Sequence, residues 1–149
     1  GAFHPLPTER PPAVACAAYA ALLAAAPIDL ICLGIGENGH LAFNDPPVAD
    51  FDDPVRVKVV ALDEACRRQQ VNDGCFPTLP DVPTHALTLT LPVFRDARRL
   101  SAHVPGPRKA AAVRATLRDP RSPACPATLL RDHPDATLYV DEAAAAELR

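Results

Sequence analysis

The chain carries one glycine-rich stretch on which the fold prediction depends: Leu33-Gly34-Ile35-Gly36-Glu37-Asn38-Gly39-His40-Leu41-Ala42-Phe43-Asn44-Asp45-Pro46-Pro47. It follows an apolar run, residues 28–32, which has the length and β-branched content of a buried strand. Three glycines within six residues allow a sharp turn and a close approach of the backbone to a ligand. Because ligands bind at strand ends in open parallel sheets, this polar loop with its histidine predicts a functional site.

The bulk composition narrows the class of protein. The 149 residues are 48% hydrophobic and 22% charged, which is typical of one globular domain and argues against disorder. The net charge is −3 and no basic block is present, so we expect no nucleic-acid partner. No apolar run reaches the ~18 residues of a membrane span, and no signal peptide opens the chain. We therefore expect no membrane partner and a cytoplasmic protein.

The five cysteines are widely spaced and form no C-x-x-C pair, a pattern that favours reduced thiols over a disulfide framework or a zinc site. We accordingly expect no metal site, and we expect Cys16 and Cys32, which lie in apolar segments, to be core residues. The chain begins with Gly1 and contains no methionine. We therefore expect these residues to belong to a longer or processed protein.

Hydrophobic periodicity predicts alternating strands and helices. Strands are expected at residues 28–33, 55–60, 86–91, 99–104 and 136–140, and helices at 13–26, 63–71, 108–117, 123–130 and 141–148. This alternation indicates an α/β fold with a largely parallel sheet. The helix at 13–26 consists almost entirely of small apolar residues, so we expect it to pack closely on a sheet.

His40 and Asp45 are the first candidates for chemistry. An imidazole can gain and lose a proton near neutral pH, and a nearby carboxylate can orient the ring and stabilise its protonated form. His40 could instead be a structural histidine, and Asp45 could belong to an Asx turn formed by residues 44–46. The loop around them favours the catalytic interpretation.

Lys109 and Arg67 are candidates for anion binding. Lys109 lies just inside an expected helix start, where free N–H groups and the helix dipole favour an anion. Each of the two side chains could also be an ordinary solvated surface cation. The glycines of residues 34–39 match the form G-x-G-x-x-G, but no helix-forming sequence follows them, so the dinucleotide signal is weak.

At this point residues 34–46 resemble the signature of the glucosamine-6-phosphate deaminases, also called isomerases, which are related to the 6-phosphogluconolactonases. The Leu-Ala-Phe-Asn run at residues 41–44 favours the deaminase side. Residues 82–88, 106–109 and 133–142 also resemble family segments in the expected order. The resemblance implies a three-layer α/β/α Rossmann-like fold with a mostly parallel sheet. It further implies that residues 1–149 are the C-terminal portion of a single such domain, without its N-terminal strands.

The resemblance assigns roles to four residues and leaves a fifth role harder to place. His40 falls on the histidine that assists opening of the sugar ring, Asn38 on a supporting aspartate, and Asp45 on a glutamate. Lys109 falls on the phosphate-binding lysine. The phosphate-binding arginine is harder to place: an ungapped count reaches Gln70, and Arg67 is the nearest arginine. Asn38 is neutral and cannot take up a proton as a carboxylate would.

The function expected from this resemblance is conversion of glucosamine 6-phosphate to fructose 6-phosphate and ammonia, with no cofactor. The expected partners are a phosphorylated amino sugar and further copies of the chain in a homo-oligomer. An aspartate outside these residues would move the proton between C2 and C1. Two alternatives stay open: a 6-phosphogluconolactonase, with His40 as the base for a water molecule, and a sugar-phosphate sensor that has kept the pocket but lost the proton shuttle.

Overall fold

The structure, a computed structural model, describes residues 2–149. Its helices and strands are α1 (Pro12–Ala25), β1 (Ile31–Leu33), β2 (Val57–Ala61), α2 (Glu64–Asn72), β3 (His85–Leu89), α3 (Leu91–Arg95), β4 (Leu100–Val104), α4 (Ala110–Arg118) and β5 (Ala136–Val140). Four short 3₁₀ helices complete the described part of the chain: η1 (Leu79–Asp81), η2 (Pro107–Lys109), η3 (Pro126–Arg131) and η4 (Ala146–Leu148).

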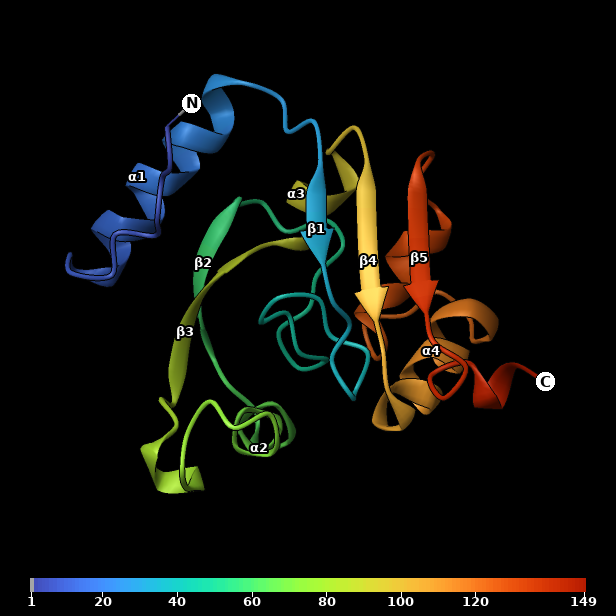
Figure 1. The fold of residues 1–149 in the computed structure, drawn as a ribbon. Helices are drawn as coiled ribbons and strands as arrows, with labels where there is room; N and C mark the ends of the chain where they lie inside the picture. The colour runs from blue at the N-terminus through green and yellow to red at the C-terminus, as the bar shows by residue number, and fades with distance from the viewer. Residues whose placement is uncertain (1) are drawn as a thin grey trace.

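Strands β1, β4 and β5 form a parallel sheet with β4 in the centre (Figure 1). Leu100, Ala102 and Val104 of β4 are buried in the main core, which also contains residues of α3, α4 and η3. The alternate residues along the strands point the other way, and Cys32 and Tyr139 are exposed. The α/β fold with its parallel sheet is therefore confirmed. Within residues 2–149, one face of that sheet is covered by helices and the other is left exposed.

Strands β2 and β3 form a separate antiparallel pair, with Val57 opposite Leu89 and Ala61 opposite His85. The sequence predicted both strands but not their pairing with each other. The pair is closed at one end by Thr90, which donates its backbone N–H to the Arg56 carbonyl at 3.0 Å and its hydroxyl to the Val55 carbonyl at 2.6 Å.

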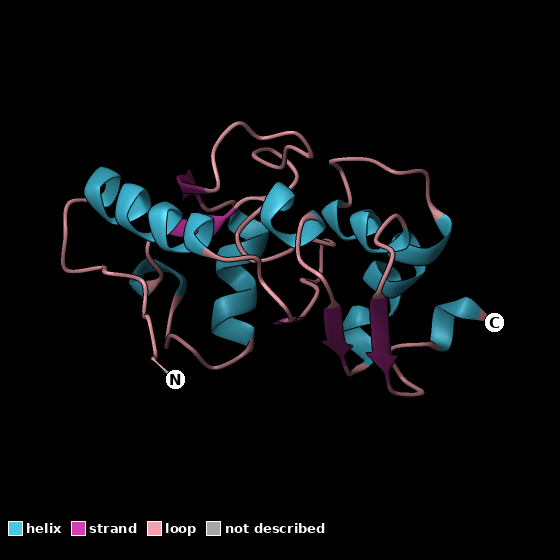
Figure 2. Ribbon diagram, turned by 90° about the horizontal axis from the view of Figure 1, so that it is seen from above, coloured by secondary structure: helices cyan, strands magenta, loops and turns pink. Residues whose placement is uncertain are grey.

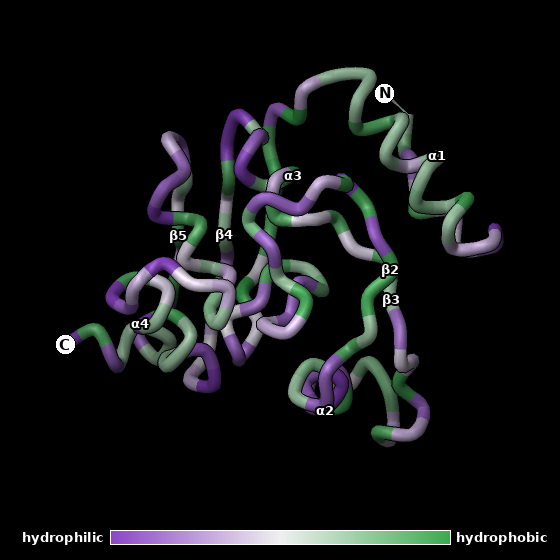
Figure 3. Tube along the Cα trace, turned by 180° about the vertical axis from the view of Figure 1, so that it is seen from behind, coloured by the Kyte–Doolittle hydropathy of each residue, from purple (hydrophilic) through white to green (hydrophobic). Residues whose placement is uncertain are grey.

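The expectation for the first helix is corrected in part. Helix α1 contacts β2 and lies at one end of the molecule, away from the parallel strands (Figure 2). Only Ala15 is buried, and Val14 and Leu22 are 50% and 46% exposed. Figure 3 shows apolar colouring along this helix. Because alanines surround the helix on all sides, no single apolar face directs it onto a sheet.

Several predicted boundaries also differ from the structure. Residues 28–30 lie outside β1, and Leu91–Arg95 forms α3, since Pro92 opens a helix at its first turn rather than merely ending a strand. The helix expected at 123–130 is the 3₁₀ helix η3, and only η4 forms within 141–148. Cys32 is exposed and Cys16 is half-buried. The prediction that both are core residues is therefore wrong. The exposure of Cys32 follows from its position on the uncovered face of β1.

Candidate functional site

The glycine-rich loop after β1 folds back on itself and presents His40. The backbone N–H of Gly36 donates to the His40 carbonyl at 3.0 Å, and that of Gly39 donates to the Gly36 carbonyl at 3.0 Å. Gly39 has a φ of 83°, which favours glycine. A Cβ on Gly36 would lie 2.2 Å from two atoms of the His40 ring. The imidazole therefore packs directly on the Gly36 backbone, which leaves no room for a side chain.

The surroundings of His40 determine which ring nitrogen carries a proton. The residue is 7% exposed, and its Nδ1 lies 2.7 Å from Asn38 Oδ1 and 3.0 Å from Asp45 Oδ1. Asn38 Oδ1 also accepts the backbone N–H of His40 at 3.1 Å, which fixes the orientation of the amide. Since both neighbours of Nδ1 are acceptors, Nδ1 is the protonated nitrogen. Nε2 is left to exchange a proton with a ligand.

Asp45 is held ionised by the groups around it. The residue is 1% exposed, and its Oδ1 accepts Nδ2–H of Asn38 at 3.1 Å as well as the contact from His40. Burial raises the pKa of Asp45, but the hydrogen bonds from His40 and Asn38, the charge of His40 and the neighbouring Cys66 together outweigh this effect and lower the pKa below its ordinary value. An aspartate at position 38 could not donate this hydrogen bond. The neutral Asn38 is therefore suited to an ionised Asp45.

The rest of the signature secures the loop. The fully buried Asn44 donates Nδ2–H to the carbonyls of Leu41 and Leu89 at 2.8 and 2.7 Å, which ties the loop to β3. Ala42 takes a φ of 51°, a strained conformation for a residue with a Cβ. Such strain persists only where neighbouring contacts enforce it. The segment after His40 is thus held in place by β3.

His40 and Lys109 line the same pocket, which has a volume of about 400 Å³. Lys109 ends η2, directly before α4, and burial lowers its pKa, partly offset by the carboxylates of Asp73 and Glu37. The turn that leads to Lys109 is fixed by Asp141, whose carboxylate accepts the backbone N–H of Gly106 at 2.9 Å. The predicted imidazole and the predicted phosphate-binding cation are therefore on one pocket.

Arg67 is not brought to this pocket. Its Nη2 donates to the carbonyls of Leu79 and Val82 at 2.8 and 2.9 Å, which ties α2 to the η1 turn. The prediction of Arg67 as a phosphate ligand finds no support in this geometry. Gln70, the residue that the ungapped count reaches, does line the pocket.

Sequence reasoning missed two neighbours of the site. His103 lines the pocket, and its ring stacks on Tyr139 with the ring centres 4.8 Å apart. Cys66 lies in the first turn of α2 and is 1% exposed. Only the pairing of β4 with β5 brings His103 beside Tyr139, and only the packing of α2 on the loop brings Cys66 to Asp45. The local sequence carries no signal for either contact.

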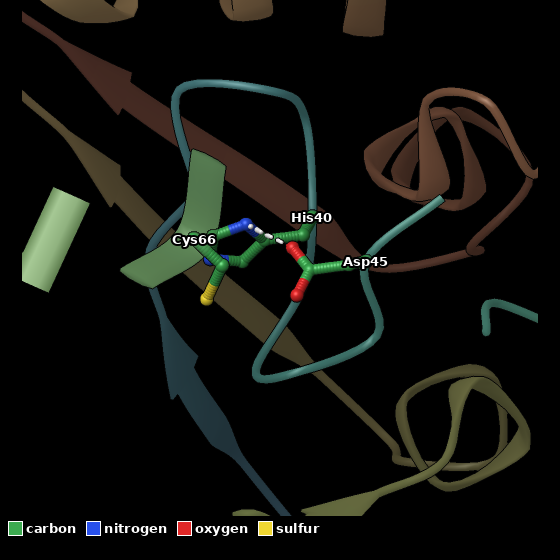
Figure 4. Close-up of side chains that lie close together, drawn as sticks. All are labelled: His40, Asp45 and Cys66. Atoms are coloured by element: carbon green, nitrogen blue, oxygen red, sulfur yellow. Dashed lines mark ion pairs between the residues drawn. The ribbon is translucent and has the colours of Figure 1, made fainter. Parts of the chain in front are cut away.

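Cys66 completes a buried cluster with His40 and Asp45 (Figure 4). One potential ligand atom of each residue lies within 4.8 Å of the others, so the three offer a nitrogen, an oxygen and a sulfur to a metal ion. Burial and the negative charge of Asp45 raise the pKa of the Cys66 thiol to about 12. A neutral thiol and a protonated Nδ1 would each have to lose a proton before binding a metal ion.

Comparison with known proteins shows the family to which the chain belongs. Residues 1–139 match the profile of the family described as glucosamine-6-phosphate isomerases/6-phosphogluconolactonase. The chain belongs to this family. A glucosamine-6-phosphate deaminase of Bacillus cytotoxicus is 42% identical over 129 residues, which are 87% of this chain and 47% of the relative. One from Bacillus thuringiensis strain Al Hakam has the same identity and coverage.

Solved structures of this family share the fold. The structure of a monomeric glucosamine-6-phosphate deaminase of the NagB superfamily superposes with a TM-score of 0.83 and 34% identity, over 91% of this chain and 54% of the other. The 6-phosphogluconolactonase of Trypanosoma brucei gives a TM-score of 0.70 at 20% identity, over 93% and 54% of the two chains, and shows the fold alone. The chain thus spans about half the length of the relatives it matches.

None of the helices in the described part of the chain combines the length and the hydropathy that a membrane span requires.

Proposed function

We propose that these residues form the ring-opening and phosphate-binding part of a glucosamine-6-phosphate deaminase. The observation that carries the proposal is the pocket shared by His40 and Lys109, with Asp45 and Asn38 fixing the imidazole from behind. Family membership and the deaminases at 42% identity support the same reaction class. The net reaction converts glucosamine 6-phosphate and water into fructose 6-phosphate and ammonia.

His40 acts on the sugar ring in this proposal. With Nδ1–H shared between Asn38 and Asp45, the protonated imidazole donates its Nε2 proton to the ring oxygen as the bond from that oxygen to C1 breaks. C1 becomes the carbonyl carbon of the open-chain aldehyde, and the proton of its hydroxyl group passes to solvent water. The carboxylate of Asp45 stabilises the imidazolium before the transfer. No metal or organic cofactor is needed for this step, because acid–base groups suffice.

Lys109 holds the phosphoryl group. An ammonium group forms charge-assisted hydrogen bonds with phosphate oxygens, and Lys109 brings one to the pocket from the end of η2, directly before α4. Among the described residues that line the pocket there is no carboxylate. We therefore assign no residue of the described chain to proton transfer between C2 and C1. We also propose that residues 1–149 are the C-terminal portion of one domain, which the uncovered face of the parallel sheet supports.

The deciding experiment measures ammonia and fructose 6-phosphate released from glucosamine 6-phosphate by the protein in its natural length. We expect turnover in the wild type and a loss of about 10²–10⁴-fold in kcat for His40→Ala. Unchanged turnover in His40→Ala would overturn the proposal.

Two further assays separate the alternatives. Hydrolysis of 6-phosphogluconolactone without ammonia release would identify a lactonase. Thermal stabilisation by glucosamine 6-phosphate with no turnover would identify a sensor. We favour the deaminase over the lactonase because the 42% identical relatives are deaminases, whereas the lactonase structure at 20% identity supports the fold alone.

A further inference from the structure

Four residues form a closed network of polar contacts at the edge of the proposed phosphate pocket. The backbone N–H of Glu37 donates to Oε1 of Gln69 at 3.0 Å, and Nε2–H of Gln69 donates to Oδ2 of Asp73 at 3.2 Å. Oδ1 of Asp73 accepts Nη2–H of Arg108 at 2.9 Å, and Nε of Arg108 lies 3.3 Å from Oε1 of Glu37. The network therefore joins three segments: the glycine-rich loop, the end of α2 and the turn η2.

The network borders the pocket at each of these segments. Gln69 lines the pocket itself. Glu37 directly follows Gly36, and Arg108 directly precedes Lys109, and both of these neighbours line the pocket as well. Two carboxylates thus lie just outside the wall of a pocket that is proposed to bind a phosphoryl group, which carries about two negative charges near neutral pH.

Each of the two carboxylates has its own reason to need a cation. Asp73 is the C-cap of α2, a position where the helix dipole disfavours a negative charge and favours a positive one. Oε1 of Glu37 is buried and accepts no hydrogen bond among the described residues, so the guanidinium group of Arg108 compensates its charge as an ion pair. The side chain of Arg108 is 51% exposed, so its removal leaves no cavity in the core.

We infer that Arg108 is a positioning residue for the phosphate site: it holds Glu37 and Asp73 and neutralises their charge, which leaves the ammonium group of Lys109 available to a phosphoryl group. Arg108 itself does not touch the substrate. The inference rests on the proposed function for the identity of the sugar, but the binding of a phosphate anion requires no turnover.

The charges around Lys109 agree with this role. Burial lowers the pKa of Lys109, the carboxylates of Asp73 and Glu37 raise it, and the positive charge of Arg108 lowers it. All three charged side chains of the network therefore act on the Lys109 ammonium group. Without Arg108, the two carboxylates would compete with a phosphoryl group for this ammonium group and would repel the phosphoryl group itself.

The first test measures the dissociation constant of inorganic phosphate for the ligand-free protein in its natural length, by isothermal titration calorimetry. We expect Arg108→Ala to raise this constant by about 5- to 10-fold, because two carboxylates lose their counter-charge. Arg108→Lys keeps the charge and should raise it by only about twofold. Lys109→Gln should raise it by about 10-fold or more. A wild type that binds no phosphate, or wild-type affinity in Lys109→Gln, would overturn the inference.

A combined variant separates the effect of charge from that of mechanical support. Arg108→Ala together with Glu37→Gln and Asp73→Asn removes the ion pairs and also the two negative charges. If Arg108 acts by neutralising these charges, the phosphate affinity returns to within about twofold of the wild type. If Arg108 only fastens the loop to α2, the affinity stays low in the combined variant, and the inference is wrong.

Arg114 provides the matched control, because it also pairs with two carboxylates. Its Nη1 lies 2.9 Å from Oδ1 of Asp119 and its Nε lies 3.6 Å from Oε2 of Glu147, and it does not line the pocket of His40. Arg114→Ala changes the net charge by the same amount as Arg108→Ala, so we expect no change in phosphate affinity. Equal losses in the two variants would show that net charge alone sets the affinity, against the inference.

Steady-state kinetics separates this inference from the proposed function. With glucosamine 6-phosphate we expect Arg108→Ala to raise KM by about 5- to 10-fold and to leave kcat nearly unchanged, because His40 keeps its contacts. If the wild type shows no turnover but the phosphate constants change as expected, the proposed function fails and the role of Arg108 stands. If turnover is present and Arg108→Ala lowers kcat with KM unchanged, Arg108 does not act on the phosphate site.

Discussion

Gly36 and His40 depend on each other at the level of single atoms. The imidazole lies on the Gly36 backbone, so a methyl group there would lie 2.2 Å from two ring atoms. We expect Gly36→Ala to displace the ring from Asn38 and Asp45 and to lower kcat by about 100-fold, since misplacement of a catalytic group by about 1 Å has this effect. Steady-state kinetics measures the loss, and circular dichroism shows whether the fold is kept.

The neighbouring glycine provides a comparison for this prediction. A Cβ on Gly34 would lie 3.6 Å from the His103 carbonyl, which is an ordinary contact. Gly34→Ala is therefore expected to have a much smaller effect than Gly36→Ala. Similar losses in both variants would show that the close approach of ring and backbone is not what the loop requires.

At the scale of whole elements, the start of α4 and the start of α2 present two cations with different roles. Lys109 lines the pocket, whereas the guanidinium group of Arg67 donates hydrogen bonds to the backbone carbonyls of Leu79 and Val82. We expect Lys109→Gln to raise KM for the phosphorylated sugar by about 10- to 100-fold with little change in kcat, because it removes a charge-assisted bond to the phosphate.

We expect the reverse from Arg67→Ala. This variant should leave KM almost unchanged and lower the free energy of unfolding by about 1–3 kcal/mol, because two carbonyls lose their donor. Urea denaturation and steady-state kinetics on both variants give the comparison. A large KM effect in Arg67→Ala would restore that arginine as a phosphate ligand.

These elements also show what the sequence could predict. The strand and glycine loop of residues 31–40 are predictable because their signals are local: β-branched residues, then turn residues at fixed spacing. Lys109 lines the same pocket as His40 because β1 and β4, which precede them, are adjacent in the parallel sheet. The contacts that Arg67 and Cys66 make were not predictable, because they depend on how α2 packs against η1 and against the glycine-rich loop. No residue within α2 encodes that packing by itself.

At the scale of the whole molecule, the parallel sheet has two different faces. One face forms the main core with α3, α4 and η3, and the other exposes Cys32, His103 and Tyr139. Parallel sheets in α/β proteins are ordinarily covered on both faces. The site lies at the ends of the parallel strands. It is therefore supported by the core on the covered face of the sheet and by the loop that Asn44 connects to β3. The stability of that loop is therefore coupled to the stability of the core.

The buried Asp45 makes this coupling measurable as a dependence of stability on pH. Because the folded protein lowers the pKa of Asp45 below its ordinary value, the ionised carboxylate stabilises the folded state, and this contribution is complete above the unfolded pKa of about 4. It is lost as the pH falls through the lower folded pKa.

We expect the free energy of unfolding of the wild type to exceed that of Asp45→Asn by a constant amount from pH 7 to about 5, and the difference to shrink below about pH 4. Urea denaturation across this range measures it, and Asp29→Asn, which removes an exposed carboxylate paired with Arg98, should show no such trend. A difference that stays constant or grows on acidification would mean that Asp45 is not held ionised by His40 and Asn38.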